Sequence, residues 1–421
     1  MTRTRRQFLA ETVAGSAVIS MTGAVPGFLR ATAAAEGAAG RRSDRILVVV
    51  QLSGGNDGLN TVVPYKDDLY FRRRPSIALD PRQVRKLDDA LALHPAMGGL
   101  AKLFEDRRLT VIEGVGYPNP SRSHFVSMDI WHSARPEKPD KRSGWLGRSL
   151  AAARSDADAG KVRALSLGGK ELPPALVADG VEVPAVEDLR DFQLRLEGGS
   201  SGDQSARRRL LAELTDRSGA GNAGATGPLA FVSDTMRTTY AAAEALAEVT
   251  AKSADRVRYP DGPLGRSLRG VAQVIAAGFG TRIFYTSLGG FDTHAKQIPA
   301  HAQLMAQVSD SIKAFWDDIR AQGRENDVLL MTFSEFGRRV EQNASHGTDH
   351  GTAAPMFLVS GRTPGGIVGR PPSLTDLMDG GDLKHQFDFR AVYATVLEKW
   401  LGADPAAVLG GRFDPLPIVS A

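Results

Sequence analysis

The chain has 421 residues, of which 52 are lysine or arginine and 48 are aspartate or glutamate, giving a formal net charge of +4 at pH 7. It has no cysteine, which excludes disulfides, thiolate catalysis and sulfur ligands for a metal. No basic stripe with interleaved aromatic residues occurs, and the run 207–209 is typical of a solvated helix face, so we expect no nucleic-acid partner.

The segment 1–35 has the pattern of a twin-arginine export signal. The pair Arg5 and Arg6 precedes a weakly apolar run at 14–29 and a small-residue stretch at 31–35. A membrane anchor is the alternative, but glycines and a proline break the run, which falls short of the roughly 20 apolar residues that a span needs. We therefore predict export by the twin-arginine machinery, a periplasmic or extracellular location, and no stable membrane anchor. The segment also accounts for three of the four net positive charges.

Short runs rich in β-branched and aromatic residues recur along the rest of the chain, and this pattern is typical of buried strands. The predicted strands are 46–52, 109–112, 162–167, 282–287, 328–333 and 356–359. Longer stretches with helical periodicity lie between them. The predicted helices are 95–104, 146–154, 229–252, 264–279, 300–322 and 389–401, the last with Asp388 as its N-cap.

Strands that alternate with helices predict an α/β fold with a mostly parallel central sheet covered by helices on both faces. We expect a single α/β domain over 36–421. Glycine-rich stretches flank one helix at 188–228, and we interpret this segment as a flexible surface insertion or lid.

Acidic residues follow three of the predicted strands. Asp57, Asp292 and Glu335 each come a few residues after a strand ends. Because the carboxyl ends of parallel strands meet at one edge of a sheet, we expect these carboxylates to lie close together. For Asp57, a tight turn or an anion-binding nest formed with the two glycines before it is the alternative.

The stretch from 289 to 350 holds four of the eight histidines and several acids. Its candidate metal ligands are Asp292, His294, Glu335, His346, Asp349 and His350. Carboxylates and neutral imidazoles together form a donor set for divalent cations such as Zn, Mn, Mg or Ca. Aspartate and histidine beside glycine are also ordinary turn residues. Two such clusters together with a strand-end carboxylate favour a metal or catalytic centre.

A serine-rich turn at 121–127 supplies the candidate nucleophile. Two prolines precede it, and Ser121 or Ser123 then opens a helix whose free N–H groups favour an anionic group. Arg122 is placed to hold two oxygens of a tetrahedral oxyanion. The alternatives are that the serines only cap the helix and that His124 is a packing residue.

Six ordered motifs resemble those of the DUF1501 family, a set of exported proteins of undefined activity. The motifs are 51–60, 123–131, 289–294, 333–338, 346–351 and 388–393. That family is similar in turn to the alkaline phosphatase and sulfatase superfamily. The resemblance implies an α/β sandwich with divalent metal ions, often two, at the strand ends and a serine, threonine or modified cysteine that attacks phosphate or sulfate esters.

The resemblance also implies roles for single residues. Asp57 matches the acidic ligand after the first strand, and Ser123 or a neighbour matches the nucleophile. Asp292 and His294 match an aspartate and a histidine that follow a later strand, although one residue separates them here where the superfamily usually has three.

The last acidic residue and histidine have two possible registers. In the first, they are Asp349 and His350. In the second, which we prefer because each ligand then lies at a strand boundary, Glu335 takes the acidic position and His350 is the final histidine. Asp349 would then orient His350.

Pro118 stands where a related sulfatase carries the residue that becomes formylglycine, and proline cannot form that aldehyde. The favoured prediction is an exported metal-dependent hydrolase of small-molecule or polymer-borne phosphate-type esters. Ser123 would carry out in-line displacement, with Arg122 and Arg338 binding the ester oxygens. The alternatives are a metal-binding protein with a decayed site and an exported assembly protein that docks through 188–228.

Overall fold

The computed structural model describes residues 45–138, 142–153, 163–181, 183–189, 257–378 and 380–420. The predicted export signal, most of the predicted insertion and the predicted helix 229–252 lie outside these ranges. Export therefore stays a prediction from the sequence.

A nine-stranded sheet runs through the molecule in the order β13-β5-β12-β9-β1-β8-β6-β7, with β16 paired to β5. Its strands are β1 (Ile46–Leu52), β5 (Leu109–Gly116), β6 (Ala164–Leu167), β7 (Ala185–Val186), β8 (Ile283–Leu288), β9 (Val328–Phe333), β12 (Ala354–Val359), β13 (Gly366–Val368) and β16 (Phe387–Asp388). Only β12 is antiparallel to its neighbours, β5 and β9. The predicted mostly parallel sheet is confirmed.

The central strand β1 contributes to two hydrophobic cores. Val48 and Val50 pack into the core on one face of the sheet, and Leu47 and Val49 pack into the core on the other. Successive side chains of a strand point to opposite faces, so a strand covered on both faces must be apolar at nearly every position. This explains the nearly unbroken apolar run from which the strand was predicted.

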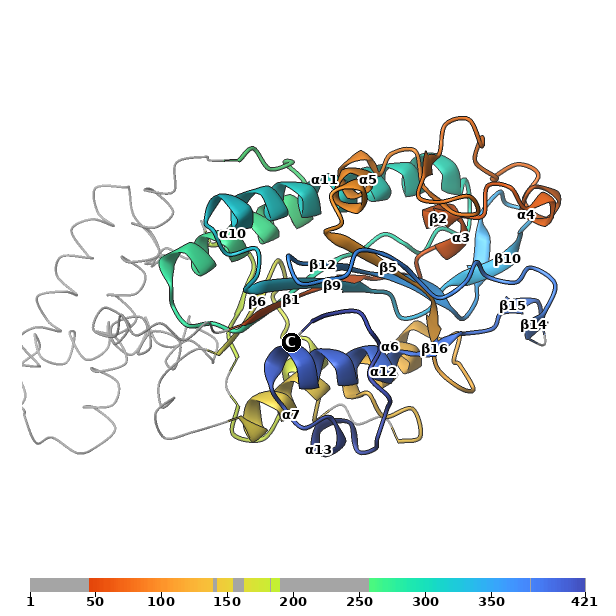
Figure 1. Ribbon diagram of the computed structural model, residues 1–421. Helices are drawn as coiled ribbons and strands as arrows, with labels where there is room; N and C mark the ends of the chain where they lie inside the picture. The colour runs from red at the N-terminus through yellow and green to blue at the C-terminus, as the bar shows by residue number, and fades with distance from the viewer. Residues whose placement is uncertain are drawn as a thin grey trace, which may run out of the picture.

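Helices cover both faces of the sheet (Figure 1). One face carries α5 (Gly98–Glu105), α10 (Pro263–Ala277) and α11 (Gln297–Ala321), and the other carries α6 (His124–Ser133), α7 (Trp145–Ala152), α12 (Phe389–Thr395), its π-helical continuation η4 (Val396–Leu401) and α13 (Pro405–Leu409). Asp388 caps α12 by accepting a hydrogen bond from the Arg390 amide at 2.9 Å, as predicted. None of the helices in the described ranges has the length and apolar character needed to cross a bilayer.

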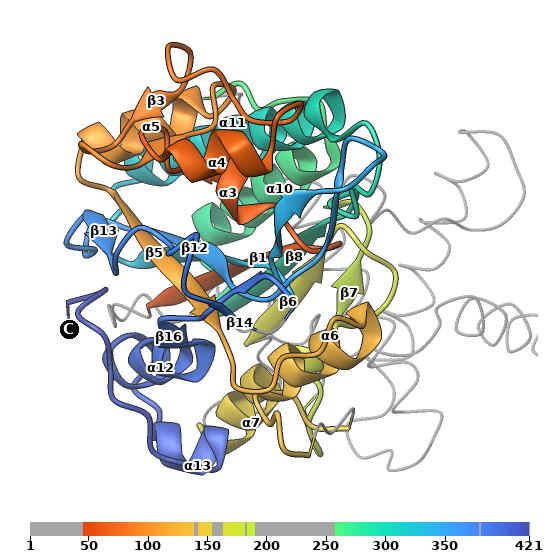
Figure 2. The ribbon, with the colours of Figure 1, turned by 90° about the vertical axis from the view of Figure 1, so that its right-hand side faces the viewer.

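Smaller elements gather at one end of the sheet, which faces the viewer in Figure 2. They include α3 (Gly58–Thr61), α4 (Asp68–Arg73), β10 (Arg338–Gln342), β11 (Thr348–His350), β14 (Leu377–Met378) and β15 (Asp382–Leu383). The remaining short elements are β2 (Val62–Val63), β3 (Arg85–Lys86), β4 (Ala92–Leu93) and η2 (Pro174–Leu176). The parallel strands end at this edge, where the candidate residues were expected to meet.

Most predicted elements differ from the observed ones by a few residues at one or both ends, and two of these differences have a clear physical reason. Strand β5 continues four residues beyond the predicted 109–112, through Glu113 and through Gly114, which has a φ of 64°. A charged residue followed by a glycine interrupts the apolar pattern without ending the strand. Helix α11 begins at Gln297, before Pro299, because the first turn of a helix tolerates proline.

Glu113 generates a prediction about stability. It is buried, and its Oε1 has no hydrogen-bond partner among the described residues. Burial, with a smaller effect of Asp88, raises its pKa from 4.5 to about 8. The folded state therefore binds a proton that the unfolded chain releases, and the free energy of unfolding falls as pH rises through this window, by up to about 1.4 kcal/mol per pH unit.

We expect Glu113→Gln to flatten that decline between about pH 5 and about pH 8 in urea unfolding curves. The exposed Glu398→Gln is the matched control and should leave the pH dependence unchanged. An equal decline in the Glu113→Gln variant and the unaltered protein would contradict the raised pKa.

Candidate metal centre

The chain reaches the strand-end edge from several directions. The segments after β5, β8 and β9 bring His124, Asp292 and Glu335 to this edge. Strand β12 runs the opposite way, so its first residue lies at the same edge and the segment before it carries His350. Because β12 is reversed, His350, which precedes it, lies at the same edge as the residues that follow the parallel strands.

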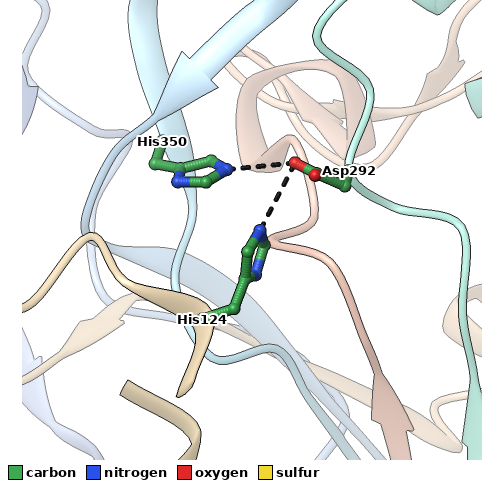
Figure 3. A group of neighbouring side chains, drawn as sticks. All are labelled: His124, Asp292 and His350. Carbon is green, nitrogen blue, oxygen red and sulfur yellow. Dashed lines mark hydrogen bonds and ion pairs between the residues drawn. The ribbon is translucent and has the colours of Figure 1, made fainter. Parts of the chain in front are cut away.

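Ligand-type atoms of His124, Asp292 and His350 lie within 4.8 Å of one another. His350 Nε2 is 3.0 Å and His124 Nε2 is 3.4 Å from Asp292 Oδ1 (Figure 3). His294 joins them, because its Nε2 lies 3.0 Å from Asp292 Oδ1 and 2.9 Å from His350 Nε2. We call these four residues the candidate centre.

Each histidine of the candidate centre directs its other ring nitrogen, Nδ1, to an oxygen outside the centre. These oxygens are Glu335 Oε1 at 2.8 Å for His124, the Arg122 carbonyl oxygen at 2.8 Å for His350 and Asp349 Oδ1 at 3.4 Å for His294. A carbonyl and an ionised carboxylate only accept hydrogen bonds, so Nδ1 carries the proton. In a neutral ring, Nε2 then presents a lone pair to the centre.

Three imidazole lone pairs and a carboxylate oxygen thus face one another, and all of them are acceptors. His124 Nε2 is also buried and has no hydrogen-bond partner among the described residues. Such a group needs a shared positive charge, either additional protons on the rings or a metal cation. Nitrogen and oxygen donors with oxygen-bound Nδ1 groups are what zinc-type centres use. The residues therefore fit one divalent cation.

The candidate centre is open to solvent. The Asp292 side chain is 49% exposed and the His294 side chain is 43% exposed. Structural zinc sites are closed by their ligands, whereas catalytic sites leave a position that water or substrate can reach. The exposure favours a catalytic type of centre.

Asp292 is the carboxylate on which the candidate centre converges. Burial acts to raise its pKa, but the hydrogen bond and positive charge of Arg338, together with the contact to His350, hold the pKa well below its usual range. Arg338 Nη2 lies 2.7 Å from Asp292 Oδ1. The carboxylate is therefore anionic at neutral pH, as a metal ligand must be.

Arg338 was expected to bind substrate oxygens, but the structure buries its side chain completely. Its guanidinium donates to the carbonyl oxygens of Gly54, Gly55, Phe291 and Thr348 as well as to Asp292. These carbonyls belong to the loops after β1 and β8 and to β11. Arg338 is therefore a positioning residue that joins three segments and fixes Asp292.

Asp57 was expected to be a metal ligand, but it lies in a separate buried ion pair. Its Oδ2 accepts a hydrogen bond from Arg74 Nη1 at 2.6 Å and another from Gln297 Nε2. Burial acts to raise the pKa of Asp57, but the charge and hydrogen bond of Arg74 lower it overall. The structure does not bring Asp57 into the candidate centre.

The other three predicted ligands take different places. Glu335 is buried and accepts from the Gly54 amide at 2.8 Å in addition to His124, so it orients His124. Asp349 lies beside His294 and not, as expected, beside His350. His346 lies in the turn between β10 and β11, where its Nδ1 is 2.7 Å from Ser76 Oγ.

The structure also separates the candidate serines. Ser127 is buried, with its hydroxyl bonded to the Glu335 carbonyl oxygen and to Tyr117. Ser121 Oγ accepts from the Ser123 amide at 3.2 Å. Ser123 is the N-cap residue of α6, is exposed, and makes no side-chain cap hydrogen bond.

His124 is the ligand candidate that sequence reasoning left out. From the sequence, His124 was interpreted only as a packing residue. One signal was present in the sequence, because His124 follows a strand end just as Asp292 and Glu335 do. Because the strand was predicted to end at residue 112, four residues before its observed end, His124 lay too far along the chain to be counted among the residues that follow a strand.

The fold and the site together define an α/β protein with a candidate divalent-metal centre at the carboxyl edge of its sheet. The chain belongs to the family described as "Protein of unknown function (DUF1501)", whose model matches residues 44–412. A comparison with curated proteins finds no match to this chain.

Three solved structures illustrate the structural likenesses. The lipoteichoic acid synthase LtaP from Listeria monocytogenes is 8% identical with a TM-score of 0.36, covering 80% of this chain and 67% of that one. A sulfatase from Pseudoalteromonas sp. is 10% identical with a TM-score of 0.38, covering 96% and 74%. A protein in the alkaline phosphatase superfamily from Vibrio parahaemolyticus is 8% identical with a TM-score of 0.34, covering 82% and 71%. These likenesses are weak, and none determines what this chain binds or does.

The role of Arg338 can be measured as stability. We expect Arg338→Met to lower the free energy of unfolding by about 3–5 kcal/mol, because it leaves buried carbonyl oxygens without donors. The exposed Arg72→Met on α4 makes the same chemical change and should cost less than about 0.5 kcal/mol. Urea unfolding measures the free energy of unfolding of both variants. Equal decreases in Arg338→Met and Arg72→Met would contradict the role of Arg338 in joining the three segments.

Proposed function

We propose that this protein is a metal-dependent hydrolase of phosphate-type esters that uses one divalent cation and Ser123. The observation that carries the proposal is the convergence of three imidazole Nε2 atoms on Asp292 Oδ1 at a solvent-open strand edge. One cation is proposed because the remaining strand-end carboxylate, Asp57, is already paired with Arg74.

The four side chains of the candidate centre define where the cation would bind and what it would do there. His124, Asp292, His294 and His350 would hold it. A bound divalent cation lowers the pKa of a nearby hydroxyl or water and offsets negative charge on ester oxygens. Glu335 and Asp349 would keep the lone pairs of His124 and His294 directed inward, which raises the basicity of both rings.

Ser123 supports the hydrolase proposal because its hydroxyl is exposed beside His124 at the start of α6. The free N–H groups of this helix's first turn favour a negatively charged group. Ser123 would lose its hydroxyl proton to solvent, and its Oγ would form a bond to the phosphorus atom while the bond to the leaving oxygen breaks and that oxygen leaves as an anion or takes a proton from solvent. Water would then hydrolyse the serine ester and restore the hydroxyl.

Metal content tests the candidate centre. We expect purified protein to hold about one equivalent of a divalent cation by elemental analysis, and His350→Ala to lose it, because one of four ligands is removed. His346→Ala is the matched control, since it removes an exposed histidine four residues away that contacts Ser76. Cation loss in both variants, or no cation in the unaltered protein after incubation with Zn or Mn, would contradict the centre.

Ser123→Ala tests the nucleophile. We expect hydrolysis of 4-nitrophenyl phosphate or bis(4-nitrophenyl) phosphate to fall at least about a hundredfold, with metal content unchanged. Ser76→Ala removes a distant hydroxyl and should retain the rate. If Ser123→Ala keeps full activity, water is the direct nucleophile. A full complement of metal without turnover of either ester would favour a metal-binding protein over an enzyme.

A further inference from the structure

Gln297, the first residue of α11, is a buried glutamine beside the candidate centre. Its Oε1 accepts hydrogen bonds from Thr293 Oγ1 at 3.1 Å and from Thr348 Oγ1 at 2.7 Å. Its Nε2 donates to Asp57 Oδ2. A single amide group therefore contacts three segments, which are the loop after β1, the loop after β8 and strand β11.

Two of these segments carry ligands of the candidate centre. Thr293 lies between two ligands in the loop after β8, and Thr348 begins β11, which ends at His350. Both threonines are buried, and each donates its one hydroxyl proton to Gln297. The position of Gln297 Oε1 therefore sets where the two ligand-bearing segments lie relative to each other.

Asp57 determines which way round the amide of Gln297 lies. The oxygens of an ionised carboxylate only accept hydrogen bonds, so the amide nitrogen faces Asp57 and the amide oxygen faces the threonines. Arg74 holds Asp57 in turn, with Nη1 at 2.6 Å from Oδ2. Arg74 also donates to the carbonyl oxygens of Val340 at 2.8 Å and Arg339 at 2.7 Å, both in β10. The buried ion pair thus fixes the amide relative to the hairpin of β10 and β11.

Other groups hold different parts of the same segments. Arg338 binds backbone carbonyl oxygens of both segments and the Asp292 carboxylate. The Arg122 side chain, which was expected to bind substrate oxygens, donates through Nε to the buried Asp382 at 2.7 Å, and the Arg122 carbonyl oxygen accepts from His350. Removing the amide of Gln297 would leave these contacts in place and leave two buried hydroxyl groups without their acceptor.

The chemistry of Gln297 favours a role in geometry over a role in packing. A buried amide costs free energy unless both its oxygen and its nitrogen form hydrogen bonds, whereas an apolar side chain of similar length fills the same space without that cost. Hydrogen bonds are directional, so a fully bonded amide fixes the relative positions of its partners more narrowly than apolar contacts do.

We propose that Gln297 is a positioning residue of the candidate centre. It sets the spacing between the loop after β8 and strand β11, which carry three of its four ligands, and the ion pair of Asp57 and Arg74 acts on the centre through it. Ligands that are held in place before the cation arrives lose less freedom when it binds. The proposal rests on the cation of the proposed function, but not on ester hydrolysis or on Ser123.

The experiment measures the Zn affinity of the full chain by competition with a chromophoric chelator. We expect Gln297→Met to bind Zn at least about tenfold more weakly, which is the scale of loss when contacts around metal ligands are removed. Methionine keeps the length of the side chain and removes its amide. Gln273→Met in α10 is the matched control, since it makes the same change at another buried glutamine and should bind Zn within about twofold of the unaltered protein.

Cobalt distinguishes a changed centre from a less stable fold. Co²⁺ binds the same nitrogen and oxygen donors as Zn, and its visible absorption depends on the number and arrangement of its ligands. We expect the Co²⁺ spectrum of Gln297→Met to differ from that of the unaltered protein, and the spectrum of Gln273→Met to match it. A loss of stability alone lowers the melting temperature without changing the spectrum.

A second variant keeps the test decisive if Gln297→Met does not fold. Thr348→Val removes one of the two hydroxyl donors with little change in shape, and we expect it to weaken Zn binding and alter the Co²⁺ spectrum in the same direction. Its control is Thr395→Val, at a buried threonine of α12 that donates to the Ala391 carbonyl oxygen. Thermal melting of each variant shows whether the fold is intact.

The outcomes distinguish the positioning role from the proposed hydrolase. Weaker Zn binding and a changed Co²⁺ spectrum in Gln297→Met, without ester turnover by the unaltered protein, would support the positioning role and remove the hydrolase. Turnover by the unaltered protein, with Zn affinity and Co²⁺ spectrum unchanged in Gln297→Met, would overturn the positioning role and leave the hydrolase. Equal loss of Zn affinity in Gln297→Met and Gln273→Met also overturns it. Failure of the unaltered protein to bind either metal would overturn both.

Discussion

The candidate centre depends on one buried guanidinium. Taking the Arg338 charge out of water is costly, and it is stable only because carbonyl oxygens from three segments and the Asp292 carboxylate surround it. The same contacts leave little freedom to the loop that carries Asp292. An arginine at the centre of several loops therefore gives a strand-end site the rigidity that loops lack on their own.

Sheet topology supplies the second constraint. At the carboxyl edge of a parallel sheet, the functional side chains come from the loops that follow the strands. A site built only from parallel strands is therefore limited to residues on those loops. The antiparallel β12 removes that limit, because the hairpin of β10 and β11 before it reaches the same edge. His350 and Arg338 come from this hairpin. Anionic carboxylates, imidazoles and a guanidinium thus meet on a small area without any one loop having to carry them all.

The sequence predicted the sheet better than the site, for physical reasons. Strands β1 and β9 were placed with their observed bounds because both are apolar runs ended by polar residues. The pairing of Asp57 with Arg74 and of His124 with Glu335 could not be seen in the same way. These are contacts between side chains 17 and 211 residues apart, and no local pattern encodes which partner a carboxylate finds.

The contacts of Glu335 also indicate at which stage of folding the candidate centre forms. Its carboxylate joins His124, 211 residues earlier, to the amide of Gly54, 281 residues earlier. Contacts of such sequence separation close only after most of the chain has collapsed, so the donor atoms converge late in folding. A cation held by them would therefore bind the native sheet and not an early intermediate. It would oppose unfolding of the whole domain more than the opening of any single loop.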